Sequence, residues 1–433
     1  MKLILFFFVI AIPLFASPKI ITRDLVLIDE EIFILVENLP PCQPFTLNSR
    51  FTDVKGFDWE ASSTYFANED GVANLSQTPP ISGSYRGIDS MGLFCTMMRT
   101  DGVPAFPALD NLNMEVTLSL TTYEKVITKV VKRQSLLPQV DVIPIEEEGL
   151  YGTLFMPPSD CPQSVVITLS GSNGGTGKGR AALLASHGVA TLALGYFSFE
   201  GLPKNLENID LAYFEKVFSW IDDRSELSGK IGLYGVSRGA ELALLLGSFF
   251  PERISAVLAV VPSSVVWGAL GNPREAAWIY EGKPVLPSAP FPMAKLDINR
   301  GKDPSDPFST RHFHMMGRSM VEEWEPAMIP VEKMQGPVLL VSGGDDQMWP
   351  SDVFAADLAE RLESASIPHN HLLYPEAGHG ITVPYLPRSN HYLHPHVQRW
   401  FSLGGSRKGD EMASRDFWLK GIEFFRKWSS EEQ

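Results

Sequence analysis

The feature that most constrains the fold of this chain is a short segment in which an apolar run leads through two glycines into a helical pattern. The run Lys230–Tyr234 indicates a buried strand, and Glu241–Phe249 has the composition of a helix. Between them, Gly235 and Gly239 flank Ser237. Side chains at the two glycine positions would collide with neighbouring backbone in so sharp a turn, which leaves the serine exposed on a strained backbone. The segment predicts a nucleophile elbow rather than an ordinary tight turn.

Beyond about residue 141 the chain alternates β-rich apolar runs with stretches of helical period. Such alternation is typical of a mostly parallel sheet whose crossover helices cover both faces. The Pro- and Gly-rich stretch 263–334 interrupts the pattern and is long for a plain connection, so we expect it to form a cap or an active-site border. We expect helices near 209–220 and 418–425, and further strands at Val165–Leu169, Ala190–Leu194, Val338–Val341 and His371–Tyr374.

A serine at such a turn is a weak nucleophile unless a base, itself oriented by an acid, removes its proton. The predicted strand 338–341 runs into Gly343-Gly-Asp-Asp, where Asp345 and Asp346 compete for the role of the acid. We favour Asp346 because Gly-x-x-Asp, followed by an apolar residue and Pro350, is the usual register for this acid. Asp345 would then be a solvated or turn-capping carboxylate.

The base is expected at His379, which lies between two glycines on a loop just after the last predicted strand. A histidine in that place can reach over the nucleophile. The order Ser237, Asp346, His379 along the chain is the order found in the α/β-hydrolase fold. The sequence therefore predicts an α/β-hydrolase in which these three residues form a catalytic triad.

The negative charge that develops when the serine attacks a carbonyl needs backbone N–H donors. We expect one from Arg238 and the second from Ser172, in the glycine-rich loop 170–179 after the strand Val165–Leu169. That loop also resembles a phosphate-binding loop and, more loosely, a dinucleotide-binding fingerprint. The first motif lacks its initial glycine and final Ser/Thr, and the second stands several residues beyond its strand, so both fit poorly.

The N-terminal part of the chain has a different texture. Met114–Thr121 alternates apolar and polar residues, Ile32–Val36 is a short β-rich run, and turn signals recur between such runs, which predicts a small antiparallel β-sandwich. Before it, Lys2, the apolar run Leu3–Phe15 and small residues predict a secretory signal peptide, and hence a periplasmic or secreted protein. If that segment is not functional, the protein is intracellular. We divide the chain into a signal peptide (1–17), a sandwich (18–140) and a catalytic domain (141–433).

Composition narrows the range of partners. The chain has 36 Lys and Arg against 51 Asp and Glu, a formal net charge of −15, which disfavours nucleic-acid binding. Three cysteines match no zinc motif, and the cluster His391, His394 and His396 lacks a fourth ligand, so we expect these histidines at the surface or in the core. We predict neither a metal nor a cofactor, and membrane contact only through the N-terminal segment if it is not cleaved.

Several motifs resemble the type I acyl-CoA thioesterase and bile acid-CoA:amino acid N-acyltransferase family. The resemblance covers nearly all of the chain after the signal segment, including the C-terminal helix, and implies an immunoglobulin-like sandwich followed by an α/β-hydrolase domain. The family's triad falls on Ser237, Asp346 and His379, and its thioesterases, unlike the transferase, carry serine at the elbow. The segments that carry the resemblance are Gly87–Leu93, Leu183–Ala190, Leu192–Phe197, Leu202–Pro203, Gly343–Trp349 and Tyr374–His379.

The resemblance implies hydrolysis of fatty acyl-CoA through an acyl-enzyme, with Lys178, Arg180 and Arg238 as candidate contacts for the CoA phosphates. Three alternatives stay open: an N-acyltransferase in which an amine takes the acyl group, an exported carboxylesterase acting on esters other than CoA esters, and a non-catalytic binding protein. The expected partner is a small-molecule acyl thioester or ester.

Overall fold

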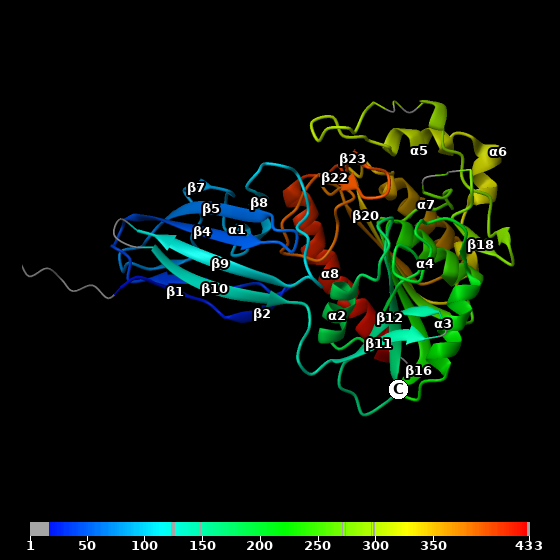
Figure 1. The fold of residues 1–433 in the computed structure, drawn as a ribbon, viewed down its shortest axis with the longest axis horizontal. Coiled ribbons are helices and arrows are strands. Elements are labelled where there is room, and N and C mark those ends of the chain that lie inside the picture. Colours follow the sequence, from blue (N-terminus) through cyan, green and yellow to red (C-terminus); the bar gives the residue numbers. More distant parts are fainter. Residues whose placement is uncertain are drawn as a thin grey trace, which may run out of the picture.

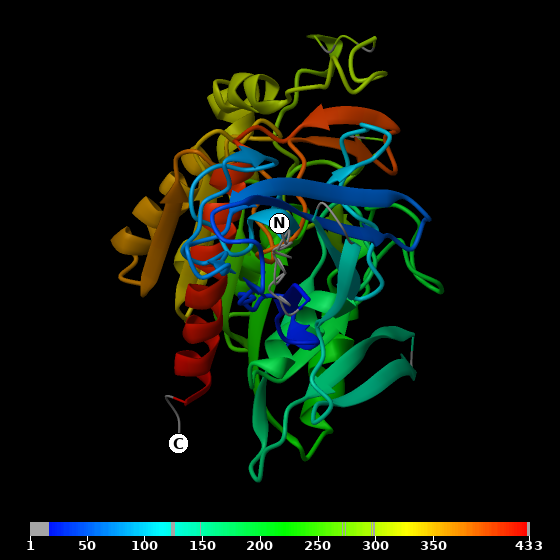
Figure 2. The same cartoon turned by 90° about the vertical axis from the view of Figure 1, so that its left-hand side faces the viewer.

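In the computed structural model of the chain, the described residues are 17–122, 126–147, 149–270, 272, 274–295, 297 and 299–430. The predicted signal peptide therefore lies outside the described residues except for Ser17. The N-terminal strands lie beside a larger part that carries most of the helices (Figure 1). Figure 2 views the molecule from the side of these strands, with the long C-terminal helix α8 (Arg407–Ser430) running behind them.

Alternation of apolar and polar residues accounts for the N-terminal sheets. Along β9 (Met114–Thr121) every second side chain is buried, so one face of the strand packs inward. All pairings are antiparallel except that β2 runs parallel to β10. This two-sheet, all-β arrangement fits the predicted immunoglobulin-like domain. The larger sheet has the order β2 (Leu25–Leu27), β10 (Val126–Gln134), β9, β4 (Pro44–Thr52), β5 (Asp58–Phe66) and β7 (Ser82–Gly83), with β8 (Met98–Arg99) paired to β5, and the smaller has the order β1 (Lys19–Ile21), β3 (Leu35–Glu37) and β6 (Ala73–Asn74).

Two details of this part differ from the sequence prediction. The run Ile32–Val36 joins a strand only at its end, in β3, because the backbone of its first residues pairs elsewhere. The Ile32 N–H points at the sulfur of Met91, 3.1 Å away, and the Ile34 carbonyl accepts from the Leu75 N–H at 3.1 Å. A short helix, α1 (Gly92–Cys95), also interrupts the strands and is fully buried.

The second sheet has eight strands. Six neighbouring strands of it run parallel to one another: β14, β13, β16, β17, β20 and β21. β11 and β12 form an antiparallel hairpin at its edge. Three strands of this sheet were not predicted from the sequence: β11, β12 and β17, although residues 256–260 of β17 are continuously apolar. The strand order is β11 (Asp141–Glu147), β12 (Leu150–Met156), β14 (Thr191–Leu194), β13 (Gln163–Leu169), β16 (Leu227–Val236), β17 (Ile254–Val260), β20 (Val338–Gly343) and β21 (His369–Tyr374).

Helices cover both faces of this sheet. Successive side chains along a strand point to opposite faces, and in these strands both sets of side chains are apolar. In β13, Val166 points into the core beneath α8 and α2 (Lys178–Ser186), whereas Val165 and Ile167 point into the core on the opposite face. That opposite face packs against α3 (Ala212–Asp222), α4 (Arg238–Phe249) and α7 (Ser351–Ser364). The predicted α/β-hydrolase fold, preceded by an all-β domain, is confirmed.

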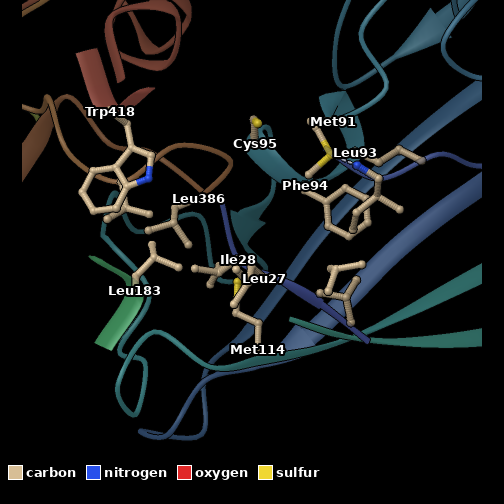
Figure 3. Close-up of a cluster of buried hydrophobic side chains, with 14 of the residues drawn as sticks. Leu27, Ile28, Met91, Leu93, Phe94, Cys95, Met114, Leu183, Leu386 and Trp418 are labelled. Atoms are coloured by element: carbon tan, nitrogen blue, oxygen red, sulfur yellow. Dashed lines mark hydrogen bonds between the residues drawn. The ribbon is translucent and has the colours of Figure 1, made fainter. Parts of the chain in front are cut away.

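The core beneath α8 continues into the sandwich. Leu27, Leu93 and Met114 of the sandwich belong to the same cluster of buried side chains as Leu183 of α2 and Trp418 of α8 (Figure 3). A shared apolar core of this kind fixes how the two parts sit against each other.

The stretch 263–334 lies at the end of the catalytic part that also carries the hairpin of β22 (His391–His394) and β23 (Arg399–Ser402) (Figure 1). Its described residues form short elements rather than a further layer of the sheet, in keeping with a cap. No helix in the described part of the chain is long and apolar enough to cross a membrane. The elements are β18 (Trp278–Tyr280) and β19 (Lys283–Pro284), which pair with β15 (Ile209–Asp210), the 3-10 turns Met293–Lys295, Glu325–Ala327 and Val331–Lys333, and the helices α5 (Arg311–Arg318) and α6 (Val321–Trp324).

The hairpin of β22 (His391–His394) and β23 (Arg399–Ser402) packs against the glycine-rich loop after β13 through several side chains, one of which is a buried histidine. His394 is only 2% exposed. Its Nδ1 accepts the backbone N–H groups of His396 (3.2 Å) and Val397 (3.3 Å), so Nε2 carries the proton and donates to the Ser172 hydroxyl at 3.0 Å. A second proton would break the contacts at Nδ1, and burial lowers the pKa of His394 to about 4.

We expect this histidine to make the fold sensitive to acid. The unfolded chain protonates it near pH 6.5 and the folded chain only near pH 4, so its contribution to stability is complete above pH 6.5 and is lost as the pH falls towards 4. The limiting slope for one proton is about 1.4 kcal/mol per pH unit. His394→Gln should therefore lower Tm at pH 8 and lower it less at pH 4.5, measured by circular dichroism. A difference in Tm that does not change with pH would contradict this account.

Candidate active site

The site is built around the turn between β16 and α4, where the backbone is strained at one residue. Ser237 has φ 56° and ψ −122°, a region that L-residues seldom occupy. A Cβ placed on Gly235 would lie 2.1 Å from the carbonyl oxygen of Gly239, and one on Gly239 would lie 2.5 Å from that of Leu169. Both glycines are therefore required by close packing, and the predicted elbow is present.

Of the three residues predicted as a triad, His379 lies within hydrogen-bonding distance of both Ser237 and Asp346. His379 Nε2 is 2.9 Å from the Ser237 hydroxyl, and His379 Nδ1 is 2.8 Å from Asp346 Oδ2. Asp346 is fully buried, and its other oxygen accepts the backbone N–H groups of Met348 (3.0 Å) and Trp349 (3.2 Å). With the carboxylate oriented in this way, Nδ1 of the histidine carries its proton and Nε2 is free to accept one from the serine.

The neighbouring carboxylate has a different environment. Asp345 is exposed and turns away from the histidine. One of its oxygens accepts from the Gln347 amide at 2.7 Å, and the other accepts the Gly405 N–H at 2.9 Å. Asp345 therefore caps a turn. A solvated or turn-capping carboxylate is what we predicted for the aspartate that does not act as the acid.

The two predicted oxyanion donors lie on either side of the serine. Arg238 is the first residue of α4, and no described residue accepts a hydrogen bond from its backbone N–H. On the other side the serine is approached by Gly171, where a Cβ would lie only 3.3 Å from the Cβ of Ser237. Ser172 follows directly and is held by His394. Gly171 was not predicted as part of the site, although a glycine immediately after a buried strand was a usable signal. His394 was expected at the surface or in the core, and it is buried, but its contact with Ser172 was not predicted.

The side chain of Arg238 is not available to a phosphate, so that expectation was wrong. It is 5% exposed and lies 3.4 Å from the buried carboxylate of Glu241, while its Nη2 donates to the carbonyl of Trp267 at 3.0 Å. Glu241 also accepts the Trp267 N–H and, at 2.7 Å, the indole N–H of Trp278. Arg238 and Glu241 therefore join the start of α4 to the cap residues Trp267 and Trp278.

The other two candidate phosphate contacts remain accessible. Lys178 and Arg180 line a groove of about 530 Å³ between the N-terminus of α2 and the sandwich loop 109–112. The Arg180 guanidinium also lies over the ring of Tyr234, 5.0 Å from its centroid. Across the residues that the structure describes, no group of three or more His, Cys, Asp or Glu side chains is arranged to hold a metal ion.

Comparison with known proteins gives matches over most of the chain. The family described as BAAT/acyl-CoA thioester hydrolase C terminal matches residues 209–431, and the acyl-CoA thioester hydrolase/BAAT N-terminal region matches residues 29–147. Acyl-coenzyme A thioesterase 6 of Mus musculus is 32% identical, over 94% of this chain and 95% of that protein. The peroxisomal succinyl-coenzyme A thioesterase of Mus musculus is 31% identical, over 92% of this chain and 93% of that protein.

A human relative extends the comparison. The mitochondrial acyl-coenzyme A thioesterase 2 of Homo sapiens is 30% identical, over 92% of this chain and 81% of that protein. Along the chain, the N-terminal region of the family is matched first and the C-terminal region second. The chain therefore belongs to the BAAT/acyl-CoA thioester hydrolase family.

Proposed function

We propose that this protein is an acyl-CoA thioesterase that hydrolyses fatty acyl-CoA to a free fatty acid and CoA. The observation that carries the proposal is the hydrogen-bonded series from Ser237 through His379 to the buried Asp346. The similarity to acyl-CoA thioesterases along nearly the full length of the chain supports the substrate class. Within this proposal, residues 18–140 form the sandwich domain and residues 141–433 the catalytic domain.

In the first step, His379 Nε2 takes the proton of the Ser237 hydroxyl as its oxygen attacks the thioester carbonyl. Asp346 stabilises the resulting imidazolium and holds its orientation. The N–H groups of Arg238 and Ser172 would bind the oxyanion of the tetrahedral intermediate. Its collapse breaks the carbon–sulfur bond and leaves an acyl-serine, while CoA departs as the thiol with the proton from His379.

In the second step, His379 takes a proton from water, which attacks the acyl-serine carbonyl. The second tetrahedral intermediate collapses to the fatty acid, and the proton returns to Ser237. A thiolate leaves readily, so the first step demands less acid assistance than amide cleavage does. If an amine took the place of water, the same site would perform N-acyl transfer.

Purified protein should release CoA from a panel of acyl-CoAs, and Ser237→Ala should lower kcat by roughly 10⁴-fold or more because the nucleophile is gone. Thiol release is followed with a chromogenic disulfide, and a p-nitrophenyl ester and an amine acceptor are run alongside. Ester cleavage without CoA release would favour an exported carboxylesterase, and an amide product detected by mass would favour an N-acyltransferase. No turnover and no reaction with a fluorophosphonate probe would refute an enzymatic role.

The two neighbouring aspartates provide a matched pair of variants. Asp346→Asn should lower kcat by roughly 10³- to 10⁴-fold, because an amide no longer favours the tautomer that keeps His379 Nε2 free. Asp345→Asn should stay within about twofold of the wild type, since surface substitutions of this kind have small effects. Steady-state kinetics on one acyl-CoA measures both. Equal losses in the two variants would contradict the assignment of the acid.

Export is a separate part of the proposal and rests on the N-terminal sequence alone. Expression of the full chain should give a mature protein that begins near residue 17 or 18 in an exported fraction, as N-terminal sequencing would report. A protein that retains Met1 and stays inside the cell would remove the signal peptide from the proposal. It would leave the thioesterase activity unaffected.

A further inference from the structure

The segment that carries His379 has an unusual dependence on other parts of the chain. Residues 378–388 form neither helix nor strand, so their backbone groups need partners from elsewhere. Several of these partners are side chains. From α8, Asp410 accepts the Gly378 N–H at 2.7 Å, Ser414 accepts the Thr382 N–H at 3.1 Å, and Glu411 accepts the Tyr385 N–H at 2.9 Å.

Arg388 cross-links this segment from within. It is 3% exposed, and its two terminal nitrogens donate to the carbonyl oxygens of Gly380 (2.9 Å) and Val383 (3.0 Å). Its Nε donates to Glu411 of α8 at 2.8 Å. The guanidinium thus fixes the curvature of the turn that begins directly after His379.

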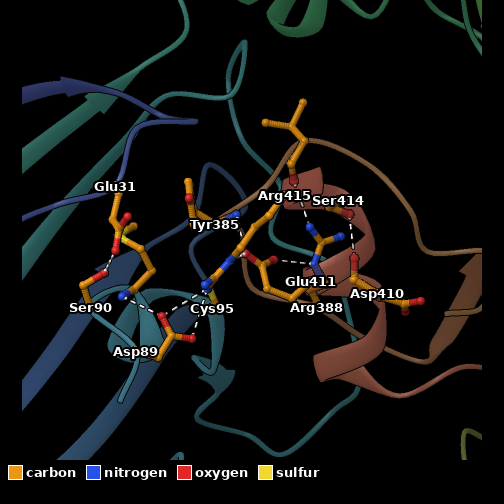
Figure 4. A network of polar contacts seen from close by, with 12 residues as sticks. Glu31, Asp89, Ser90, Cys95, Tyr385, Arg388, Asp410, Glu411, Ser414 and Arg415 are labelled. Atoms are coloured by element: carbon orange, nitrogen blue, oxygen red, sulfur yellow. Dashed lines mark hydrogen bonds and ion pairs between the residues drawn. The ribbon is translucent and has the colours of Figure 1, made fainter. Parts of the chain in front are cut away.

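Glu411 in turn is tied to the sandwich. Arg415, one turn along α8, donates to Glu411 at 2.9 Å and to both oxygens of Asp89, at 3.0 and 3.2 Å (Figure 4). Burial alone would raise the pKa of Glu411, but the charges of Arg388 and Arg415 outweigh it and hold that pKa below its usual value. Glu411 is therefore an ionised link between two guanidinium groups.

A second sandwich side chain reaches the same segment. Arg133, at the end of β10, is 1% exposed. Its Nη1 donates to the carbonyl of Tyr385 at 2.8 Å, and its Nη2 donates to the carbonyl of Ile28 in the sandwich. Two cations, the buried Arg133 and the partly buried Arg415, thus connect the N-terminal domain to the histidine segment by different routes.

We propose that the sandwich domain positions the active-site histidine, with Asp89 acting through Arg415, Glu411 and Arg388 on the segment 378–388. These are positioning residues, because none of them contacts the reacting atoms. The inference rests on the proposed role of His379. The contact from His379 to Ser237 is 2.9 Å long, and a shift of about 1 Å in such a contact can cost on the order of 100-fold in rate.

The test is Asp89→Asn in the full-length protein, with Asp58→Asn as control. Asparagine at residue 89 keeps the shape and the acceptor for the Met91 N–H (2.9 Å) but loses the charge that Arg415 contacts. Asp58 pairs with Arg50 at 2.6 Å within the sandwich, and its side chain makes no hydrogen bond or ion pair with the described residues of α8. Measurements are the rate of labelling by a fluorophosphonate, kcat and KM, Tm, and amide hydrogen exchange over residues 376–388.

Asp89→Asn should lower kcat and the labelling rate by about tenfold, with KM within about twofold and faster exchange over 376–388, because the histidine is displaced while the substrate site is kept. Asp89→Glu should recover most of the rate, and Asp58→Asn should match the wild type. Arg415→Lys should reproduce the loss, since lysine cannot bridge two carboxylates as a guanidinium does.

These measurements distinguish a failure of the proposed function from a failure of the positioning role. A wild type that the probe does not label would refute the proposed function. Labelling and exchange in both Asp89→Asn and Arg415→Lys equal to the wild type would overturn the positioning role and leave the proposed function intact. A fall in Tm with unchanged kcat would reduce Asp89 to a purely structural contact and would also overturn it.

Discussion

The rest of the structure depends on the contact between Gly235 and Gly239 across the turn at Ser237. Because these two residues have no side chains, β16 can end and α4 can begin within a few ångströms, with Gly239 packed on the end of β13. That packing places the serine at the carboxyl edge of the parallel sheet. The loops after β20 and β21 end at the same edge, which is why the acid and the histidine can meet the serine there.

Much of this arrangement could be predicted from the sequence, since it follows from local patterns. The elbow, the alternation of strands and helices, and the order of serine, acid and histidine are all short-range features of the chain. The choice between Asp345 and Asp346 was also accessible, because the register of a loop relative to its strand decides which side chain turns inward. The α/β-hydrolase fold and its all-β N-terminal domain followed from the same reasoning.

What the sequence could not predict depends on contacts between distant residues. Arg238 looked like a cation available to a phosphate, yet its partner Glu241 and the cap residue Trp267 bury it. His394 looked like a surface or core residue, and only the placement of the hairpin brings it to Ser172. The run Ile32–Val36 has the composition of a strand, but its backbone pairs with residues that lie far along the chain. Each case is decided by a neighbour that no local pattern specifies.

The place of α8 after the other elements of the chain has a consequence for biosynthesis. This helix supplies Asp410, Glu411, Ser414 and Arg415, which hold the segment around His379 and join it to a domain made first. During translation the sandwich, the elbow and the acid all emerge before the residues that fix the histidine. A nascent chain that has not yet released α8 would therefore contain all three residues of the proposed triad without the contacts that hold the segment of His379. The order of the elements along the chain thus sets the order in which the site can be assembled.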